Sequence, residues 1–159
     1  MAEPISIDLT PSKPLTPADA AAAIICTKNG RYLLQQRDAI PTIFYPGHWG
    51  CFGGALEPGE TPLEALRREL NEELGLADYE ATLFSRFRFS VETAGIPALD
   101  RHYYEVVIAE SAVDSLRLGE GAAMRLFDGV EALHTLRIVP YDAFALWLHR
   151  HQAMLVGKK

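Results

Sequence analysis

Residues 53–76 read GGALEPGETPLEALRRELNEELGL, and this stretch places six glutamates within two dozen residues. Like charges four residues apart on one helix repel each other by a few tenths of a kcal/mol. Two interpretations follow. Either the carboxylates are simply solvated, or a positive group binds among them.

Helix signals bound the second half of this stretch. Thr61 is a plausible N-cap residue, Pro62 suits the first turn, and Glu64 stands three residues after Thr61, which completes a capping box. Gly75 supplies the glycine that commonly follows the last helical residue. The sequence therefore predicts a helix over residues 62–74.

Two stripes run along this predicted helix at about 100° per residue. The core-facing stripe consists of leucines: Leu63, Leu66, Leu70 and Leu74. Glu69, Glu72 and Glu73 are spaced i, i+3 and i+4, so their carboxylates converge on the other stripe. Converging carboxylates suit a hard divalent cation such as Mg²⁺. The spacing alone nevertheless favours a solvated acidic face.

The complete stretch carries a more specific pattern. Gly54 is followed after five residues by Glu60, and seven further residues separate Glu60 from the run RELNEELGL, residues 68–76. This arrangement resembles the Nudix box, G-x5-E-x7-R-E-U-x-E-E-x-G-U, where U is a bulky aliphatic residue. Every specified position is filled. The resemblance favours a functional acidic helix over a solvated one.

The resemblance implies a fold, a reaction and a set of site residues. Nudix enzymes have an α/β/α sandwich with a mixed sheet, and they cleave a nucleoside diphosphate linked to another moiety with Mg²⁺ or Mn²⁺. The implied metal ligands are Glu69, Glu72 and Glu73, with the carbonyl of Gly53 as a further ligand. Glu60 and Arg68 are implied to brace the loop against the helix.

A further acidic residue, Glu120, lies in the turn Gly-Glu-Gly before a short strand that carries Phe127. This arrangement resembles that of MutT-like members of the family. The resemblance implies that Glu120 completes the metal shell or takes a proton. The alternative is a polar turn residue. The expected catalytic residues are therefore Glu72, Glu73 and Glu120, and the general base is either Glu120 or a glutamate of the box.

Five other residues are candidates for substrate binding. Arg37 ends a predicted strand where MutT-like enzymes hold a phosphate-contacting arginine, although an ordinary surface arginine is an equal alternative. Trp49 either stacks on a base or belongs to the core. Tyr141 and Asp142 begin the last helix, where relatives read the base. Phe52 replaces a proline found in many members and either packs in its place or alters the pocket.

The expected substrate is a nucleoside triphosphate, cleaved to a monophosphate and pyrophosphate. Val91 stands where relatives that cleave ADP-ribose have a proline, and Thr93 stands where relatives that cleave diadenosine polyphosphates have a tyrosine. Two alternatives remain. One is an ADP-ribose or nucleotide-sugar pyrophosphatase, and the other is a module that senses a nucleotide without cleaving it.

Composition limits the remaining classes. The chain has 159 residues, of which 48% are hydrophobic, a globular composition. Its net charge of −6 argues against nucleic-acid binding, which would need a basic surface. The sequence contains neither a membrane-spanning apolar run nor the features of a secretory signal. Cys26 and Cys51 lie in apolar surroundings and are expected to be buried free thiols of a cytoplasmic protein, with a disulfide between them as the alternative. A homodimer is left open.

The expected organisation is an N-terminal arm over residues 1–18, rich in proline, and one α/β domain over residues 19–159. Residues 20–37 predict a hairpin that turns at Asn29-Gly30. A loop over 38–50 precedes a short strand, WGCFGG.

The second half of the chain alternates strands and helices. Strands are expected over 82–92 and 101–110, with a loop at 93–100 between them, and a further short strand over 123–128. Helices are expected over 129–135 and 140–154. The second of these helices is predicted to turn four residues to the core: Phe144, Leu146, Trp147 and Leu148.

Overall fold

The computed structural model describes residues 18–91, 93, 95–135 and 137–156. The predicted N-terminal arm lies outside the described residues except for Ala18. Within the described part of the chain, every helix is too short or too polar to cross a membrane.

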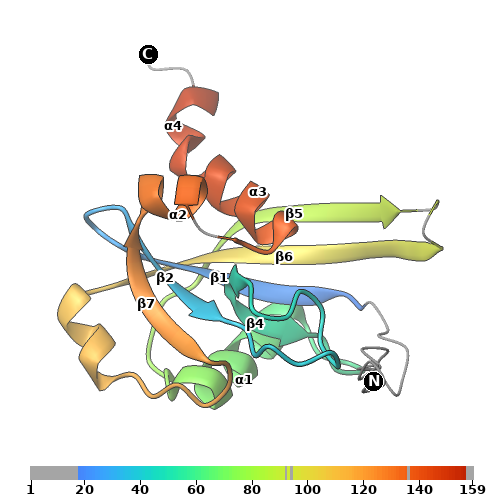
Figure 1. The fold of residues 1–159 in the computed structure, drawn as a ribbon, viewed down its shortest axis with the longest axis horizontal. Helices are drawn as coiled ribbons and strands as arrows, with labels where there is room; N and C mark the ends of the chain where they lie inside the picture. The colour runs from blue at the N-terminus through green and yellow to red at the C-terminus, as the bar shows by residue number, and fades with distance from the viewer. Residues whose placement is uncertain (1–17, 92, 94, 136, 157–159) are drawn as a thin grey trace, which may run out of the picture.

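A mixed sheet of seven strands forms the centre of the molecule (Figure 1). The strands are β1 (Ala20–Thr27), β2 (Arg31–Gln36), β3 (Trp49–Gly50), β4 (Phe52–Ala55), β5 (Thr82–Val91), β6 (Ile96–Ile108) and β7 (Ala123–Asp128). Their order is β3-β2-β1-β6-β5, while β4 also pairs with β1 and β7 with β2. The pair β1–β6 is parallel and the other pairs are antiparallel.

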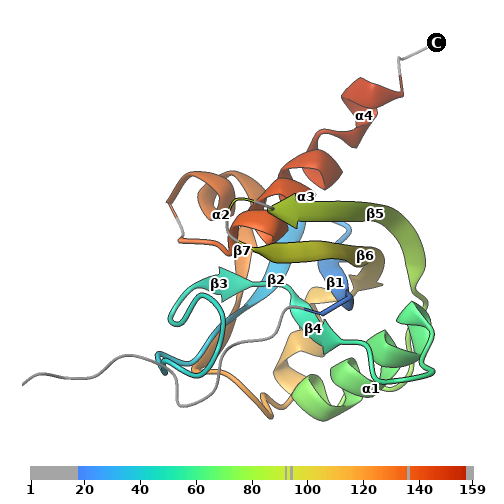
Figure 2. The same ribbon diagram turned by 90° about the vertical axis from the view of Figure 1, so that its right-hand side faces the viewer.

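Helices cover both faces of this sheet (Figures 1 and 2). Helix α1 (Pro62–Leu74) and the 3-10 helix η2 (Glu110–Ser115) pack on one face. Helices α2 (Gly129–Thr135) and α3 (Pro140–Arg150) pack on the other, and the short α4 (Gln152–Leu155) follows α3. The predicted α/β class and three-layer sandwich are therefore confirmed.

Strand β1 separates two hydrophobic clusters. Ala21, Ala23 and Ile25 belong to the cluster under α1, whereas Ile24 and Cys26 belong to the cluster under α2 and α3. The division follows from the alternation of side chains along a strand. All eight residues of β1 are buried, which explains why this strand consists of apolar residues with a final threonine.

Helix α1 has both of its predicted ends. The side chain of Thr61 accepts a hydrogen bond from the backbone of Glu64, and the Glu64 carboxylate accepts one from the backbone N–H of Thr61 at 2.8 Å. Gly75 ends the helix at a φ of 65°, a left-handed conformation that glycine adopts without strain. The helix over residues 62–74 is thus confirmed.

Two strand predictions need correction. The segment WGCFGG is two strands instead of one, because β3 pairs with β2 and β4 pairs with β1. At the break, the backbone N–H of Cys51 donates to the buried carboxylate of Asp142 at 2.9 Å. The loop expected at 93–100 is shorter than predicted, since β6 already begins at Ile96.

The prediction for the last helix was wrong in its length and in two of the residues expected to face the core. The helix ends at Arg150, and Gln152–Leu155 forms a separate short turn of helix. Phe144 and Trp147 are 49% and 50% exposed instead of buried. The buried stripe of α3 follows i, i+3, i+4, i+7 spacing and includes two polar residues: Asp142, Ala145, Leu146 and His149.

Candidate active site

One cavity of about 630 Å³, here named the acidic cavity, is lined by three of the acidic residues that the sequence analysis singled out: Glu69, Glu73 and Glu120. Glu73 is the most deeply buried of them, with 5% exposure. One of its oxygens accepts a hydrogen bond from the side-chain amide of Gln35 at 3.1 Å, and the other accepts from the backbone N–H of Gly53 at 2.8 Å. The Glu73 carboxylate is therefore held between β2 and β4.

Burial makes this end of the cavity unfavourable for negative charge. Burial is the main cause that raises the pKa of Glu73 to about 7. The hydrogen bonds from Gln35 and Gly53 oppose the shift, and the nearby carboxylates of Glu69 and Glu120 add to it. Burial also raises the pKa of Glu69, although Arg68 opposes this shift. A bound cation would relieve both effects.

The paired glycines allow the backbone to pass close to these groups. Gly53 has a φ of 128°, and a β-carbon there would stand 2.2 Å from the carbonyl oxygen of Ala21. A β-carbon on Gly54 would stand 2.3 Å from a carboxylate oxygen of Glu69. A side chain at position 53 would clash with the backbone of β1, whereas one at position 54 would displace the carboxylate of Glu69.

Arg68 connects the loop before α1 to the acidic cavity. Its guanidinium donates two hydrogen bonds to Glu60, at 2.8 and 3.0 Å, and one to Glu69 at 2.7 Å. The hydrogen bonds from Arg68 lower the pKa of Glu60 to about 2. Arg68 thus fixes the direction of the Glu69 carboxylate as well as pairing with Glu60, a contact that the sequence pattern alone does not reveal.

Glu120 reaches the acidic cavity from a separate segment of the chain. The backbone N–H of Gly119 donates to the carbonyl of Glu73 at 2.7 Å, and the N–H of Ala122 donates to the carbonyl of Gln36 at 2.8 Å. These bonds anchor both sides of the turn to α1 and β2. They place the exposed carboxylate of Glu120 beside the buried Glu73.

The remaining acidic residues of the box region lie outside the cavity lining. The side chain of Glu72 is 60% exposed, with one oxygen 3.7 Å from a guanidinium nitrogen of Arg68. Glu57 is similarly exposed and lies 3.9 Å from Arg68. Glu64 is used in the helix cap.

The lining of the cavity also includes cationic and aromatic side chains. The guanidinium carbon of Arg101 lies 4.0 Å from the ring centroid of Tyr141. Arg37 also lines the cavity, and its Nε donates to the carbonyl of Phe44 at 2.8 Å. Further aromatic side chains complete this wall: Phe44, Tyr45, Phe89 and Phe144. One cavity therefore combines carboxylates, arginines and aromatic rings.

Three predicted substrate-binding residues do not line this cavity. Phe52 is fully buried in the cluster under α1. Trp49 packs edge-on against Phe127 with a centroid separation of 4.7 Å. Asp142 is buried, and its oxygens accept hydrogen bonds from the backbone of Cys51 and from the hydroxyl of Tyr103 at 2.7 Å.

Sequence reasoning missed several polar residues of the cavity lining, among them Gln35 and Arg101. Gln35 is buried and directly follows the apolar Leu33 and Leu34 in β2. A polar residue at the end of an apolar run is the signal that could have identified it. Arg101 has a side chain only 18% exposed, near the buried Asp142 at 3.7 Å. Nothing local in the sequence distinguishes Arg101 from a surface arginine.

The donor set at the acidic end fits a hard divalent cation. All the offered side-chain ligand atoms are carboxylate oxygens, which Mg²⁺ and Mn²⁺ prefer. The two hydrogen-bond partners of Glu73 are both neutral, so its charge is not balanced by them. Glu69 and Glu120 also line this cavity, and their negative charges raise the pKa of Glu73.

Comparison with known proteins agrees with this arrangement. The family model described as the NUDIX domain matches residues 16–154. This chain belongs to the Nudix family. The Nudix-type sandwich expected from the box is also found in solved structures. The MutT NUDIX hydrolase from Burkholderia pseudomallei has a TM-score of 0.66 and 25% identity, with 84% of this chain and 98% of that chain covered.

Curated Nudix relatives match shorter segments. The nucleoside triphosphatase NudI of Enterobacter sp. (strain 638) is 53% identical over 51 residues, which cover 32% of this chain and 36% of the relative. The 8-oxo-dGTP diphosphatase of Haemophilus influenzae is 39% identical over 77 residues, which cover 46% and 52%. The chain thus spans between a third and about half of the length of these curated relatives.

Proposed function

We propose that this protein is a metal-dependent Nudix hydrolase that cleaves a nucleoside triphosphate to the nucleoside monophosphate and pyrophosphate. One observation carries the proposal. The lining of the acidic cavity combines carboxylates with arginines and aromatic rings. A nucleoside triphosphate has the matching parts, because its phosphates bind cations and its base stacks on aromatic rings.

The residues of the box supply the acidic end. Glu69, Glu73 and Glu120 would hold Mg²⁺ or Mn²⁺, together with the Gly53 carbonyl and, after a side-chain rotation, Glu72. When bound, the ion supplies positive charge to the phosphate oxygens. Glu60 has a different role, since its two hydrogen bonds to Arg68 keep the loop and the helix in place.

The arginines and the aromatic rings of the lining would bind and orient the substrate. Arg37 and Arg101 would contact phosphate oxygens, which guanidinium groups recognise through directed hydrogen bonds. The ring of Tyr141 would stack on the base. The guanidinium carbon of Arg101 already lies 4.0 Å from the centroid of this ring. Asp142 does not contact substrate in this proposal. It positions Tyr103 and Cys51 instead, through the bonds that it accepts.

The reaction is the addition of water across a phosphoanhydride bond. The water oxygen bonds to a phosphorus atom, the bond from that phosphorus to the bridging oxygen breaks, and the bridging oxygen leaves with the electron pair on pyrophosphate. Glu120 takes the proton of the water in this proposal. The oxygens of Glu73 already accept hydrogen bonds from Gln35 and Gly53, whereas Glu120 is exposed to the cavity.

The choice of a nucleoside triphosphate rests on the relatives. The names of two curated relatives specify a nucleoside triphosphatase and an 8-oxo-dGTP diphosphatase, and these names describe those proteins. Their matches to this chain support the same substrate class. The two other functions considered, cleavage of ADP-ribose or a nucleotide sugar and sensing without cleavage, are distinct outcomes of the experiment below.

The test is a substrate panel with the full chain and Mg²⁺. Nucleoside triphosphates, ADP-ribose, nucleotide sugars and dinucleotides are compared by kcat/KM, and products are identified by phosphorus NMR. We expect a nucleoside triphosphate to give the highest kcat/KM, with a monophosphate and pyrophosphate as products. A tenfold preference for ADP-ribose or a nucleotide sugar would overturn the substrate. Nucleotide binding without any product would favour the sensing module.

A matched pair of variants tests the metal assignment. Glu73→Gln removes a charge from the buried end of the cavity, and Glu57→Gln removes one from an exposed residue of the same stretch. We expect Glu73→Gln to lower kcat about 100-fold or more and to weaken Mg²⁺ binding, because an essential ligand is lost. Glu57→Gln should retain both. Unchanged metal-dependent turnover in Glu73→Gln would refute the assignment.

A further inference from the structure

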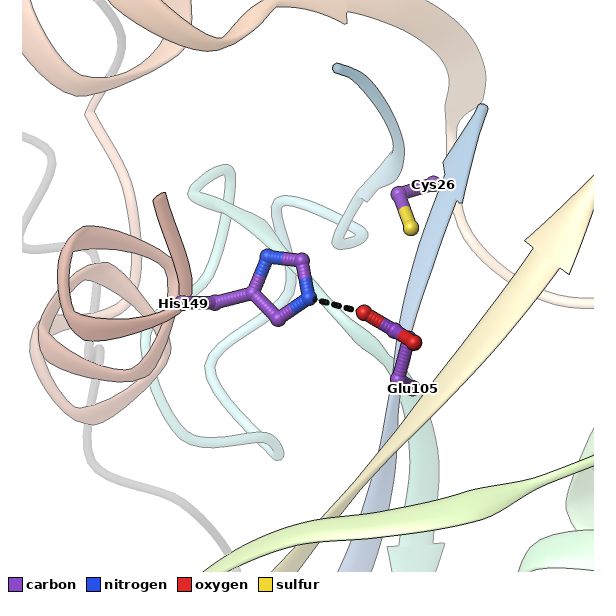
Figure 3. Close-up of side chains that lie close together, drawn as sticks. All are labelled: Cys26, Glu105 and His149. Carbon is purple, nitrogen blue, oxygen red and sulfur yellow. Dashed lines mark hydrogen bonds and ion pairs between the residues drawn. The ribbon is translucent and has the colours of Figure 1, made fainter. Parts of the chain in front are cut away.

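A second group of chemically active side chains lies on the opposite face of the sheet from α1. Cys26 of β1, Glu105 of β6 and His149 of α3 bring one ligand atom each to within 4.8 Å of one another (Figure 3). This group is named the Cys26–Glu105–His149 cluster. It lies outside the lining of the acidic cavity, so the proposed hydrolysis does not use it.

Strand register and helix packing produce the cluster. In the parallel pair of β1 and β6, Glu105 stands opposite Ile24, one side-chain step from Cys26 on the same face. Helix α3 packs on this face through Ala145 and Leu146. His149 follows on the same stripe, so its side chain reaches the two strands.

The ring of His149 is fixed by its other contacts. Its Nδ1 is 2.9 Å from the hydroxyl of Tyr32, and its Nε2 is 2.6 Å from a carboxylate oxygen of Glu105. The rings of Tyr32 and Phe84 also pack edge-on against it, at centroid separations of 5.6 and 5.0 Å. A hydrogen bond to one imidazole nitrogen that directs the other is a common arrangement around metal-binding histidines.

Two residues of the cluster are buried, and the third, Glu105, is partly exposed to solvent. Cys26 and His149 are only 6% and 7% exposed, whereas the side chain of Glu105 is 35% exposed. An ion could therefore enter beside Glu105, and a water molecule could occupy a fourth position. The two buried ligands would remain shielded from competing solvent.

We propose that Cys26, Glu105 and His149 form a zinc site with sulfur, oxygen and nitrogen ligands, in which water is the fourth ligand. A thiolate and an imidazole favour Zn²⁺, whereas Mg²⁺ prefers oxygen ligands alone. The acidic cavity and the Cys26–Glu105–His149 cluster would thus select different metals. Zinc at this position joins β1, β6 and α3 and contributes to the stability of the fold.

The geometry requires a small adjustment. Tetrahedral ligands at about 2.0 to 2.3 Å from Zn²⁺ are roughly 3.3 to 3.8 Å apart. The 2.6 Å contact between His149 and Glu105 must therefore open by about 1 Å. Binding displaces the thiol proton of Cys26, which passes to solvent. His149 binds as a neutral ring through an unprotonated Nε2, so its N–H is on Nδ1, beside the hydroxyl of Tyr32.

Cobalt is a suitable probe because Co²⁺ takes the same ligands and reports them in its spectrum. The full chain is stripped with a chelator, saturated with Mg²⁺ to occupy oxygen-only sites, and titrated with Co²⁺. We expect one equivalent to bind with a thiolate-to-cobalt charge-transfer band and tetrahedral visible bands. Zn²⁺ should then remove these bands and raise the melting temperature. A protein that shows no charge-transfer band would overturn the proposal.

Variants identify the ligands. Cys26→Ser should lose the charge-transfer band and bind Zn²⁺ at least about tenfold more weakly. Cys51→Ser is the matched control, because Cys51 is the other buried free thiol, and it should keep the band. If Cys26→Ser does not fold, the partly exposed Glu105→Gln replaces it and should weaken Zn²⁺ binding by the same factor. A band unchanged in Cys26→Ser, or an affinity unchanged in Glu105→Gln, would refute the site.

Discussion

The side-chain amide of Gln35 donates a hydrogen bond to the carboxylate of Glu73, and both groups are buried. The amide nitrogen also lies 3.4 Å from the carbonyl oxygen of Cys51. Gln35 therefore joins β2 to α1 across the acidic end of the cavity. Because one oxygen of Glu73 depends on this donor for its direction, Gln35 is a positioning residue for the proposed metal ligands.

Gln35→Leu tests this role, since leucine has a similar size and lacks the amide. We expect kcat to fall about 10-fold or more, while the KM for nucleotide changes less, because outer contacts of metal ligands contribute by this amount. Mg²⁺ affinity measured by calorimetry should fall with kcat. Gln152→Leu, at the exposed start of α4, is the control. Normal turnover and Mg²⁺ affinity in Gln35→Leu would remove Gln35 from the site.

Glu120→Gln is expected to reduce kcat about 100-fold and to leave KM within a few fold. A general base acts in the transition state, so its loss appears in kcat and not in binding. Steady-state kinetics at saturating Mg²⁺ separate these effects. Asp114→Asn, in the exposed part of η2, should have no effect. A change confined to KM would instead give Glu120 a binding role.

Tyr141→Leu is expected to raise the KM for nucleotide about tenfold, because stacking of a base on an aromatic ring contributes on the order of 1–3 kcal/mol. Tyr141→Phe keeps the ring and should behave like the unmodified protein. Both variants should keep kcat within a few fold. Equal effects in the two variants would show that the hydroxyl, and not the ring, makes the contact.

Thr61→Ala removes the side-chain acceptor from the N-terminus of α1. We expect the free energy of unfolding to fall by about 1 kcal/mol, the usual contribution of such a cap. Turnover should be retained, because the cap lies away from the cavity lining. Urea denaturation measures the change, with Thr42→Ala in the exposed loop after β2 as the control. A loss of activity at unchanged stability would contradict this prediction.

The thiol of Cys51 is expected to be protected from alkylation. Burial raises the pKa of Cys51 well above its usual value, and the carboxylate of Asp142 raises it further. The folded protein thus holds the thiol proton more tightly than the unfolded chain, so stability decreases as the pH rises above the unfolded value of 9.0. At pH 8, iodoacetamide should modify neither buried thiol until denaturant is added.

Mass spectrometry before and after denaturation counts the adducts. Two adducts are expected from the unfolded chain, because the sequence contains two cysteines. Rapid modification of Cys51 in the folded protein at pH 8 would show that the backbone around β3 and β4 opens readily.

Local signals in the sequence predicted much of the fold. The capping box at Thr61 and Glu64, the Asn29-Gly30 turn and the apolar run of β1 each involve residues close together in the chain. Their energetics are decided by neighbours within one turn or one hairpin. The corresponding helix and strands are therefore confirmed.

Contacts between distant residues were not predictable in this way. Gln35 and Glu73 are 38 residues apart, and Cys51 and Asp142 are 91 apart. The exposure of Phe144 and Trp147 has the same origin, because the face that α3 buries depends on the sheet beneath it. Arg101 joins Tyr141 only after β6 and α3 have packed.

The division of β1 between two faces has a consequence for insertions and deletions. Successive side chains of β1 alternate between the layer of α1 and the layer of α3. One extra residue inside this strand would exchange the faces of every residue beyond it. An insertion before Ala22 would turn Cys26 toward α1 and would also exchange the small side chains beside Gly53. Substitutions can therefore change the acidic cavity and the Cys26–Glu105–His149 cluster separately, whereas an insertion at the start of β1 would disrupt both together.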